Sequence, residues 1–195
     1  MKTIFTGIYN CDLWASSESK SGTGSELKAT ESIRAELPVL FTKYNIKSVL
    51  DIPCGDLNWI STLDLGGIQY TGADIVPELV AKNQEKWPDK TFLNLDLTFS
   101  ALPMADLVLV RDCFGHLSTA NVHRCLKNIK ASGIRYLLAT SMTRTIVNTD
   151  IENGQWRLLN LMVEPYDLKP LYLINEEHWM KGHDDKCLVL FDMLR

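Results

Sequence analysis

The segment 48-SVLDIPCGDLNWI-60 decides the fold. A short apolar run ends on the carboxylate of Asp51, a tight turn containing Gly55 follows, and a spacing typical of a helix then resumes. A buried strand that ends on an acid and a glycine-bearing turn is typical of the edge where a parallel sheet binds ligands. This segment therefore predicts a strand, a ligand-binding turn and a helix, in that order.

Similar apolar runs recur along the chain and alternate with helical patterns. The predicted strands are Ser48–Asp51, Gln69–Asp74, Thr91–Leu95, Ala105–Val110 and Tyr136–Thr140. The predicted helices are Ser25–Tyr44, Leu57–Leu63, Pro77–Lys86 and Ser118–Ser132, with Pro77 in a first turn, Ser118 as an N-cap and Gly133 after the last helix. Near-continuous apolar strands are covered on both faces, so the alternation predicts an α/β protein with a doubly wound parallel sheet.

The C-terminal part follows another pattern. A polar stretch without clear periodicity, 143–168, precedes two apolar segments, 171-LYLIN-175 and 187-CLVLFDML-194. The charged loop between these segments has no helical pattern, which predicts an antiparallel strand pair. We expect one domain over 1–195, made of an N-terminal lid and helix (1–44), a core (45–142), and an insert with the closing strand pair (143–195).

Composition narrows the class of protein. The chain has 195 residues, 46% hydrophobic and 23% charged, with a net charge of −4 and a pI near 5.6. The acidic balance argues against non-specific nucleic-acid binding, and no apolar run is long enough for a membrane span or a signal peptide. Five scattered cysteines without CxxC spacing indicate reduced thiols. We expect a cytoplasmic protein with no nucleic-acid or membrane partner.

Acidic residues follow the predicted strands at the edge where ligands bind. Asp74 ends the second strand, 23 residues after Asp51, and is placed to accept hydrogen bonds from vicinal ribose hydroxyls. Asp96 follows the third strand and is placed to accept from an adenine amine, with Ile75 and Leu97 on either side of the base. Together these residues predict an adenosine site. For Asp96 the alternative is a carboxylate that caps its own loop.

The first turn distinguishes between adenosine-containing ligands. A dinucleotide needs a GxGxxG turn whose helix start faces the pyrophosphate, but PCGDLN contains one glycine, Gly55, and the acidic Asp56. Asp56 would repel a pyrophosphate and favour a ligand with a positive amino group and a sulfonium. The turn therefore predicts S-adenosylmethionine as the cofactor rather than NAD.

These motifs resemble those of class I S-adenosylmethionine-dependent methyltransferases. DIPCGD stands at the first motif of that family, GADI is similar to the second, NLDL to the third, and ADLVLVRDCFGHL to the fourth. The resemblance covers 48–140 and implies a Rossmann-like seven-stranded sheet, mostly parallel with an antiparallel C-terminal strand pair. The chain looks most like a bacterial subgroup marked by DxPCGD and RDCxxHL, whose substrate is unassigned. Pro53 and Leu57 depart from the wider family, which often has glycine there.

The resemblance implies roles near the methionine end of the cofactor. Asp51 and Gly55 would line that end, with Asp56 and Trp59 close to it, and Arg111 would also contact the cofactor. The alternatives are a turn carboxylate at Asp51 and core packing at Trp59.

Asp112 and His116 fall where the transferred methyl group would point. They are the candidate catalytic residues, for substrate placement or proton removal. Methyl transfer from a sulfonium depends strongly on orientation, so His116 is alternatively a cap of the following helix. Cys113 and His116 have CxxH spacing but no further ligands nearby, so no metal is expected.

Three segments outside the motifs are candidates for closing the site. Trp14 and 22-GTGSE-26 form either a lid over the cofactor or a frayed terminus. The polar insert between Arg144 and Asn160 is expected over the open face of the pocket, where it would influence substrate choice. The segment 178-HWMKGHDDK-186 is expected to be a solvated hairpin loop.

The function predicted from the sequence is methyl transfer from S-adenosylmethionine to an oxygen or nitrogen of a small-molecule acceptor. The alternative is a methyltransferase-like domain that binds the cofactor or a partner without catalysis. A nicotinamide- or nucleotide-dependent enzyme is disfavoured because both GxGxxG and a Walker lysine are missing.

Overall fold

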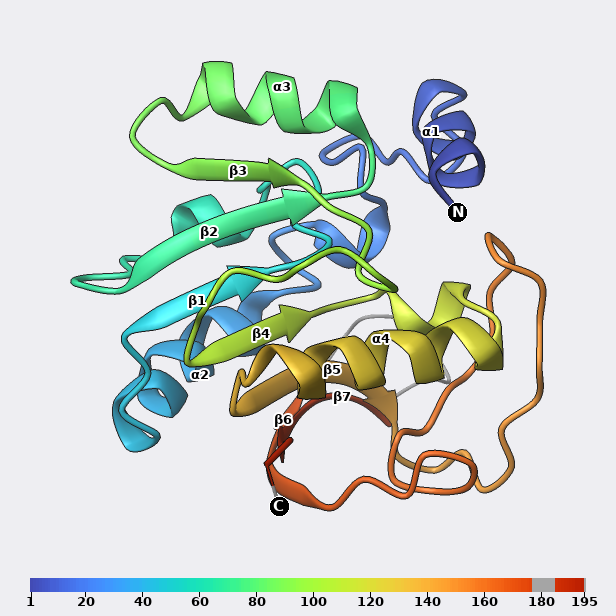
Figure 1. Ribbon diagram of the computed structural model, residues 1–195. Coiled ribbons are helices and arrows are strands. Elements are labelled where there is room, and N and C mark those ends of the chain that lie inside the picture. The colour runs from blue at the N-terminus through green and yellow to red at the C-terminus, as the bar shows by residue number, and fades with distance from the viewer. Residues whose placement is uncertain (177–184, 195) are drawn as a thin grey trace.

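The computed structural model describes residues 1–176 and 185–194, and its centre is a seven-stranded sheet. The strand order is β3-β2-β1-β4-β5-β7-β6 (Figure 1). The strands are β1 (Ser48–Asp51), β2 (Gln69–Asp74), β3 (Thr91–Asn94), β4 (Leu107–Val110), β5 (Tyr136–Met142), β6 (Pro170–Asn175) and β7 (Lys186–Asp192). No helix in the described part of the chain is long and apolar enough to cross a membrane.

The sheet topology confirms the predicted fold class. The first five strands pair in parallel, whereas β7 is antiparallel to both β5 and β6. The predicted bounds of β1 and β2 match the observed ones, those of β3 to β6 differ by one or two residues at one end, and those of β7 differ at both ends. The order runs outward from β1 through β2 to β3 and from β4 through β5, so β1 and β4 flank the topological switch point of the sheet.

Helices cover both faces of the sheet and bury alternate residues of its central strands. Leu107 and Leu109 of β4 pack in a core with α2 (Glu31–Lys43), and Val108 and Val110 pack in the opposite core with α4 (Thr119–Ser132). All four side chains are fully buried. This two-sided burial is why β4 consists of consecutive apolar residues.

Two helix ends follow their predicted signals. The helix α3 (Pro77–Lys86) begins with proline. Proline lacks an N–H, and at the first helical position an N–H would have no acceptor within the helix. Ser118 caps α4 by accepting a hydrogen bond at Oγ from the Asn121 N–H, and Gly133 ends the helix with a left-handed φ of +78°. Both helices therefore have local sequence determinants of their bounds.

One predicted helix is shorter than expected, and the prediction of a helix over Leu57–Leu63 is wrong. In place of a helix from Ser25, a 3-10 turn covers Thr23–Ser25 and α2 starts at Glu31, because the intervening backbone binds elsewhere: the Leu27 N–H donates to Glu18 Oε1 at 2.8 Å. After β1 there is a 3-10 turn at Ile60–Thr62, and Leu57 has a left-handed φ of +58° that no helix continues through.

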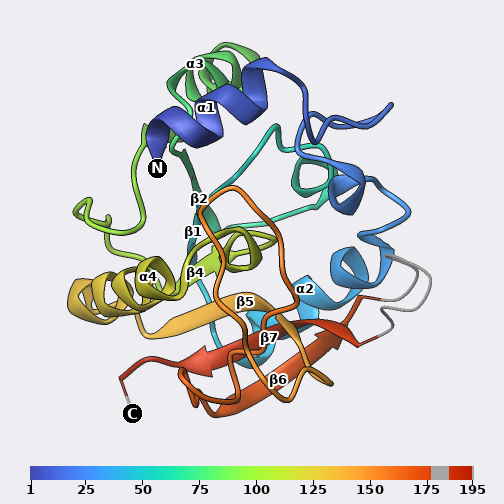
Figure 2. The same cartoon turned by 90° about the vertical axis from the view of Figure 1, so that its right-hand side faces the viewer.

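The N-terminal helix α1 (Lys2–Asn10) was not predicted. It lies at the edge of the sheet where the parallel strands end, and the insert 143–168 passes the same edge (Figure 2). None of its residues is buried, because its apolar side chains Phe5 and Ile8 face the cavity instead of a closed core. Its position over this edge brings it to the candidate site.

Candidate functional site

A cavity of about 450 Å³ lies at the carboxyl edge of the sheet, next to the switch point between β1 and β4. Ligands of doubly wound sheets bind at this position. Of the residues selected from the sequence, the cavity is lined by Trp14, Gly55, Asp74, Ile75, Leu97, Arg111, Asp112 and His116. The other four, Asp51, Asp56, Trp59 and Asp96, lie outside its lining.

Asp74 is the carboxylate at the β2 side of the cavity. Its Oδ1 accepts from the Val76 N–H at 3.0 Å and its Oδ2 from the Gly55 N–H at 3.3 Å. Burial raises the pKa of Asp74 to about 6, and the backbone hydrogen bonds oppose this rise. Each oxygen keeps a lone pair beyond its backbone bond, so the ionised group can accept from a ligand hydroxyl. Ile75 and Leu97 form an apolar wall beside the Asp74 carboxylate.

Asp51 belongs to the interior of the protein rather than to the cavity. It is 3% exposed, and its Oδ2 accepts a hydrogen bond from the Tyr70 hydroxyl at 2.7 Å. Burial raises the pKa of Asp51 to about 7. Trp59 is packed in the core that contains α2, with the Arg111 guanidinium 5.5 Å from its ring centroid.

Asp96 bonds within its own loop. Its Oδ1 accepts from the Thr98 N–H at 3.0 Å and from the Thr98 hydroxyl at 2.6 Å. This is the arrangement of the loop-capping alternative. The position predicted to bind the base therefore retains Ile75 and Leu97, with the Asp96 carboxylate turned into the loop.

The turn after β1 holds the N-terminal segment. Asp56 accepts from the hydroxyls of Ser19 and Ser21, at 2.9 and 3.2 Å, and from the Lys20 N–H at 2.8 Å. Gly55 has a left-handed φ of +57°, and a Cβ at this position would collide with Ser21 Oγ. Gly55 and Asp56 of the turn thus both contact residues 19–21 of the N-terminal segment.

The same segment and α1 cover the cavity. Residues 20–24 line it, and Arg111 fixes them by donating from Nη2 to the Gly24 carbonyl at 2.7 Å. Phe5, Ile8 and Tyr9 of α1 contribute to the lining, as does Met1 directly before it. A Cβ at Gly154 of the insert would lie 2.7 Å from Ile4 Cγ2, so the insert and α1 are in close contact. The residues expected to form a lid are ordered against the site in this structure.

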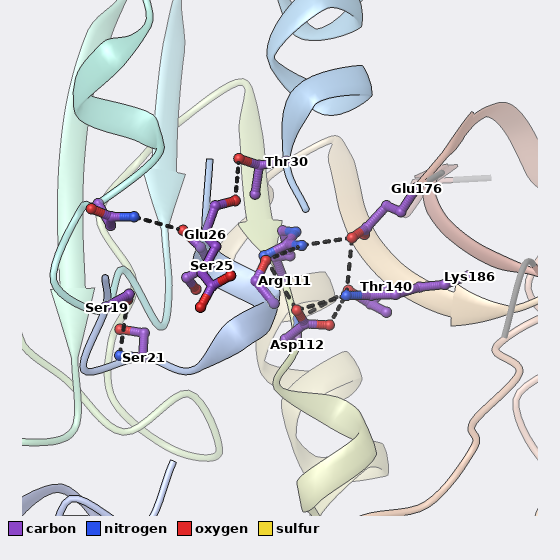
Figure 3. A network of polar contacts seen from close by, with 12 residues as sticks. Ser19, Ser21, Ser25, Glu26, Thr30, Arg111, Asp112, Thr140, Glu176 and Lys186 are labelled. Atoms are coloured by element: carbon purple, nitrogen blue, oxygen red, sulfur yellow. Dashed lines mark hydrogen bonds and ion pairs between the residues drawn. The ribbon is translucent and has the colours of Figure 1, made fainter. Parts of the chain in front are cut away.

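Four charged side chains form a network at the end of β4 (Figure 3). Glu176 Oε2 accepts from Arg111 Nη2 at 2.6 Å and from Lys186 Nζ at 2.9 Å. Asp112 Oδ2 lies 2.8 Å from Lys186 Nζ and 3.2 Å from Arg111 Nη1. Burial would raise the pKa of Asp112, but Arg111 and Lys186 outweigh it and hold that pKa well below its ordinary value. The network therefore keeps a carboxylate ionised at the cavity.

His116 lies in the 3-10 turn Phe114–His116 with its ring against the indole of Trp14, at a centroid distance of 4.5 Å. Its Nδ1 is 2.9 Å from the Gln155 carbonyl, which can only accept, so Nδ1 carries the proton. Burial lowers the pKa of His116 despite this hydrogen bond. The neutral ring then has its lone pair on Nε2, the form of a proton acceptor. Ser118 caps α4 instead, which argues against the capping alternative for His116.

The insert forms one wall of the cavity, as its position in the sequence predicts. The Arg157 N–H donates to the Gly115 carbonyl at 3.0 Å, and the Gly154 N–H donates to the His116 carbonyl at 2.9 Å. Trp156, Arg157 and Leu159 line the cavity. Backbone carbonyls hold the Arg157 guanidinium: Nη2 donates to the Leu117 carbonyl at 2.9 Å and Nη1 to the Thr149 carbonyl. These two nitrogens are therefore directed at the protein instead of at a ligand.

Lys186 and Glu176 were not selected from the sequence, and the expectation of a solvated loop is wrong for Lys186. Lys186 is fully buried and Glu176 is 1% exposed, while 177–184 lie outside the described residues. Lys186 directly precedes the apolar run of β7, which was a signal that its side chain faces the interior. The pairing of Lys186 with Asp112 spans 74 positions, which no local pattern encodes.

Comparison of the fold identifies related architectures. No protein-family model matches the chain, and no curated protein is significantly similar in sequence. Among solved structures, the 1,6-didemethyltoxoflavin-N1-methyltransferase of Burkholderia thailandensis, with bound 1,6-didemethyltoxoflavin and S-adenosylhomocysteine, has a TM-score of 0.65 at 15% identity. The alignment covers 98% of this chain and 86% of that one.

Two further structures show the same architecture. The magnesium protoporphyrin IX methyltransferase ChlM of Synechocystis PCC 6803, with bound S-adenosylmethionine, aligns over 98% of this chain and 96% of its own, with a TM-score of 0.61 and 12% identity. The N-methyltransferase NodS of Bradyrhizobium japonicum WM9 aligns over 84% and 96%, with a TM-score of 0.60 and 14% identity. The chain therefore has the Rossmann-like fold of class I S-adenosylmethionine-dependent methyltransferases.

Proposed function

We propose that this protein transfers a methyl group from S-adenosylmethionine to an oxygen or nitrogen atom of a small-molecule acceptor. The observation that carries the proposal is the Asp74 carboxylate, which lines the cavity beside Ile75 and Leu97 at the end of β2. An acid at this position of a doubly wound sheet suits the two hydroxyls of a ribose. Solved structures of the same fold contain S-adenosylmethionine or S-adenosylhomocysteine, which supports the choice of cofactor.

The residues of the cavity fit an adenosine ligand without a pyrophosphate. Asp74 would hold the ribose, and Ile75 and Leu97 would contact the faces of the base. The turn has no GxGxxG pattern, and Ser21 of the N-terminal segment packs against Gly55, so the turn offers no open glycine site for a pyrophosphate. When bound, S-adenosylmethionine supplies a methyl group activated by its sulfonium. The protein's own residues then need to orient an acceptor and exclude water.

His116 is the group that would take a proton from the acceptor. Its Nδ1 proton is fixed by the Gln155 carbonyl and its pKa is lowered by burial, so Nε2 is free to accept near neutral pH. The Trp14 ring, in tilted contact with the imidazole, limits its rotation. His116 Nε2 would hold the proton that the acceptor's O–H or N–H releases on methylation. The helix α1 and the insert cover the cavity and would exclude water from its end at His116.

Calorimetric titration tests the cofactor assignment. We expect S-adenosylmethionine and S-adenosylhomocysteine to bind the wild-type protein with micromolar affinity, of order 8 kcal/mol, and NAD to show no binding. The Asp74→Ala variant is expected to lose at least about tenfold in affinity, because two hydrogen bonds to a charged acceptor are removed. Asp89→Ala, an exposed aspartate outside the cavity lining, is the control. A preference for NAD, or unchanged affinity in Asp74→Ala, contradicts the proposal.

A second variant separates catalysis from cofactor binding. His116→Ala is expected to bind S-adenosylhomocysteine within about twofold of the wild-type protein, since its ring lies against Trp14 and the insert rather than against Asp74. Turnover with any accepted substrate should fall by about 10²-fold or more, the usual contribution of a general base. Calorimetry and a methyl-transfer assay measure the two effects. A strong loss of cofactor binding would instead mark His116 as a structural residue.

A further inference from the structure

The four members of the charge network differ in exposure. The side chains of Arg111, Glu176 and Lys186 are 4%, 0% and 0% exposed, whereas that of Asp112 is 32% exposed and lines the cavity. Arg111 also contributes to the lining, whereas Glu176 and Lys186 lie behind it. Asp112 is thus the most exposed charge of the network shown in Figure 3, and the one that a ligand in the cavity can reach most readily.

The two oxygens of Asp112 have different surroundings. Oδ2 receives Lys186 Nζ at 2.8 Å and Arg111 Nη1 at 3.2 Å. Oδ1 has a long contact of 3.3 Å with Thr140 Oγ1, which in turn accepts from the Asp112 N–H at 2.9 Å. A carboxylate oxygen accepts two hydrogen bonds, so Oδ1 has capacity for a donor on a ligand. The fixed Oδ2 prevents the carboxylate from turning away.

Asp112 and Asp74 serve different parts of the cavity. Asp74 ends β2 and Asp112 follows β4, with β1 between them. Two strand spacings separate these strands, about 10 Å. A donor bound to Asp112 therefore lies well away from a ribose bound to Asp74. Thr140, at the next strand over, extends the Asp112 side toward β5 and β7.

Aromatic rings line the Asp112 side of the cavity. His116 lies in tilted contact with Trp14, the Phe5 ring centroid lies 5.9 Å from that of Trp14, and Trp156 of the insert contributes to the same lining. Flat aromatic molecules pack well against such rings, and the ring faces also attract cations. The wall and the carboxylate together suit an aromatic ligand that carries a positive charge.

We propose that Asp112 selects an acceptor whose aromatic ring system carries a protonated alkylamine side chain, and that Lys186 and Glu176 are positioning residues for this carboxylate. The inference rests on the proposed methyl transfer and names its acceptor class. An anionic acceptor of the same shape would be repelled by the negative charge of Asp112 and is rejected. A neutral acceptor loses the charge-assisted hydrogen bond and binds with intermediate affinity.

Three indole compounds of similar shape test the charge preference: tryptamine, tryptophol and indole-3-acetate. Each is titrated into wild-type protein saturated with S-adenosylhomocysteine, with binding followed by ligand-observed NMR. We expect tryptamine to bind at least about tenfold more tightly than indole-3-acetate, with tryptophol between them. In Asp112→Asn this preference should disappear while the affinity for S-adenosylhomocysteine stays unchanged. Asp89→Asn, exposed and outside the cavity lining, is the matched control and should keep the preference.

The positioning role has its own readout. Glu176→Gln removes one negative charge without changing the shape of the side chain. Lys186 and Arg111 then neutralise the charge of Asp112 more strongly. The ratio of tryptamine to indole-3-acetate affinity should therefore fall to about a third of its wild-type value. An unchanged ratio in Glu176→Gln overturns the positioning role of Glu176.

The outcomes distinguish this inference from the proposed function. Failure of S-adenosylhomocysteine to bind would overturn the proposed function and the inference with it. Normal cofactor binding with equal ratios in wild-type protein and Asp112→Asn would overturn the inference alone. A large loss of S-adenosylhomocysteine affinity in Asp112→Asn would assign Asp112 to the cofactor and equally overturn acceptor selection.

Discussion

Replacing Asp51 with asparagine is expected to flatten the pH dependence of stability. The unfolded carboxyl group titrates near pH 4, whereas burial raises its folded pKa to about 7. Between these values the folded state holds a proton that the unfolded state has lost, so the free energy of unfolding falls as pH rises. The stabilisation is fully present below pH 4 and lost by about pH 7. The total is on the order of 4 kcal/mol, about 1.4 kcal/mol per pH unit.

Urea denaturation between pH 4 and pH 8 measures this effect. Asp51→Asn keeps an acceptor for the Tyr70 hydroxyl, so its loss of stability from pH 4 to pH 7 should be smaller than that of the wild-type protein by about 4 kcal/mol. Asp74, whose pKa is also raised, titrates in both proteins and cancels in the comparison. Asp89→Asn should follow the wild-type curve. Parallel curves for the wild-type protein and Asp51→Asn would show that Asp51 is ionised when folded.

Replacing Lys186 with methionine is expected to destabilise the fold by about 3–5 kcal/mol, the range observed when one partner of a buried ion pair is removed. Lys186 is fully buried and binds both Glu176 Oε2 and Asp112 Oδ2, so its loss leaves two carboxylates to share Arg111. Glu176 Oε1 already has no hydrogen-bond partner among the described residues. The variant therefore adds an uncompensated buried charge to a site that is incompletely satisfied.

A double-mutant cycle identifies the origin of this loss. Lys186→Met combined with Glu176→Gln removes one charge of each sign, so the double variant should be less destabilised than the sum of the single variants by about 1–3 kcal/mol. Lys127→Met, on the exposed side of α4, is the control for the methionine substitution and should change stability by less than about 0.5 kcal/mol. Additive effects in the cycle would show that Lys186 and Glu176 do not interact.

Local signals account for the parts of the fold that were predicted correctly. The bounds of β1, β2 and α3 follow from apolar runs that end on acids and from Pro77. The predicted start of α2 was wrong because Glu18, in the N-terminal segment, accepts a hydrogen bond from the Leu27 N–H. The helix α1 was missed because it is short and its apolar residues line the cavity instead of entering the core. In both cases the determining contacts are with distant segments.

The sequence by itself determined the order of the strands and helices, the acids at the strand ends and the glycine in the first turn, because these depend on residues close together in the chain. Tertiary structure decided which acids face the cavity. Asp51 and Asp74 end neighbouring strands, yet Asp51 meets Tyr70 in the interior and Asp74 lines the cavity. Asp112 is held by Lys186, 74 positions away. Burial and long-range pairing set the charge and direction of a carboxylate, and neither can be read from its neighbours in sequence.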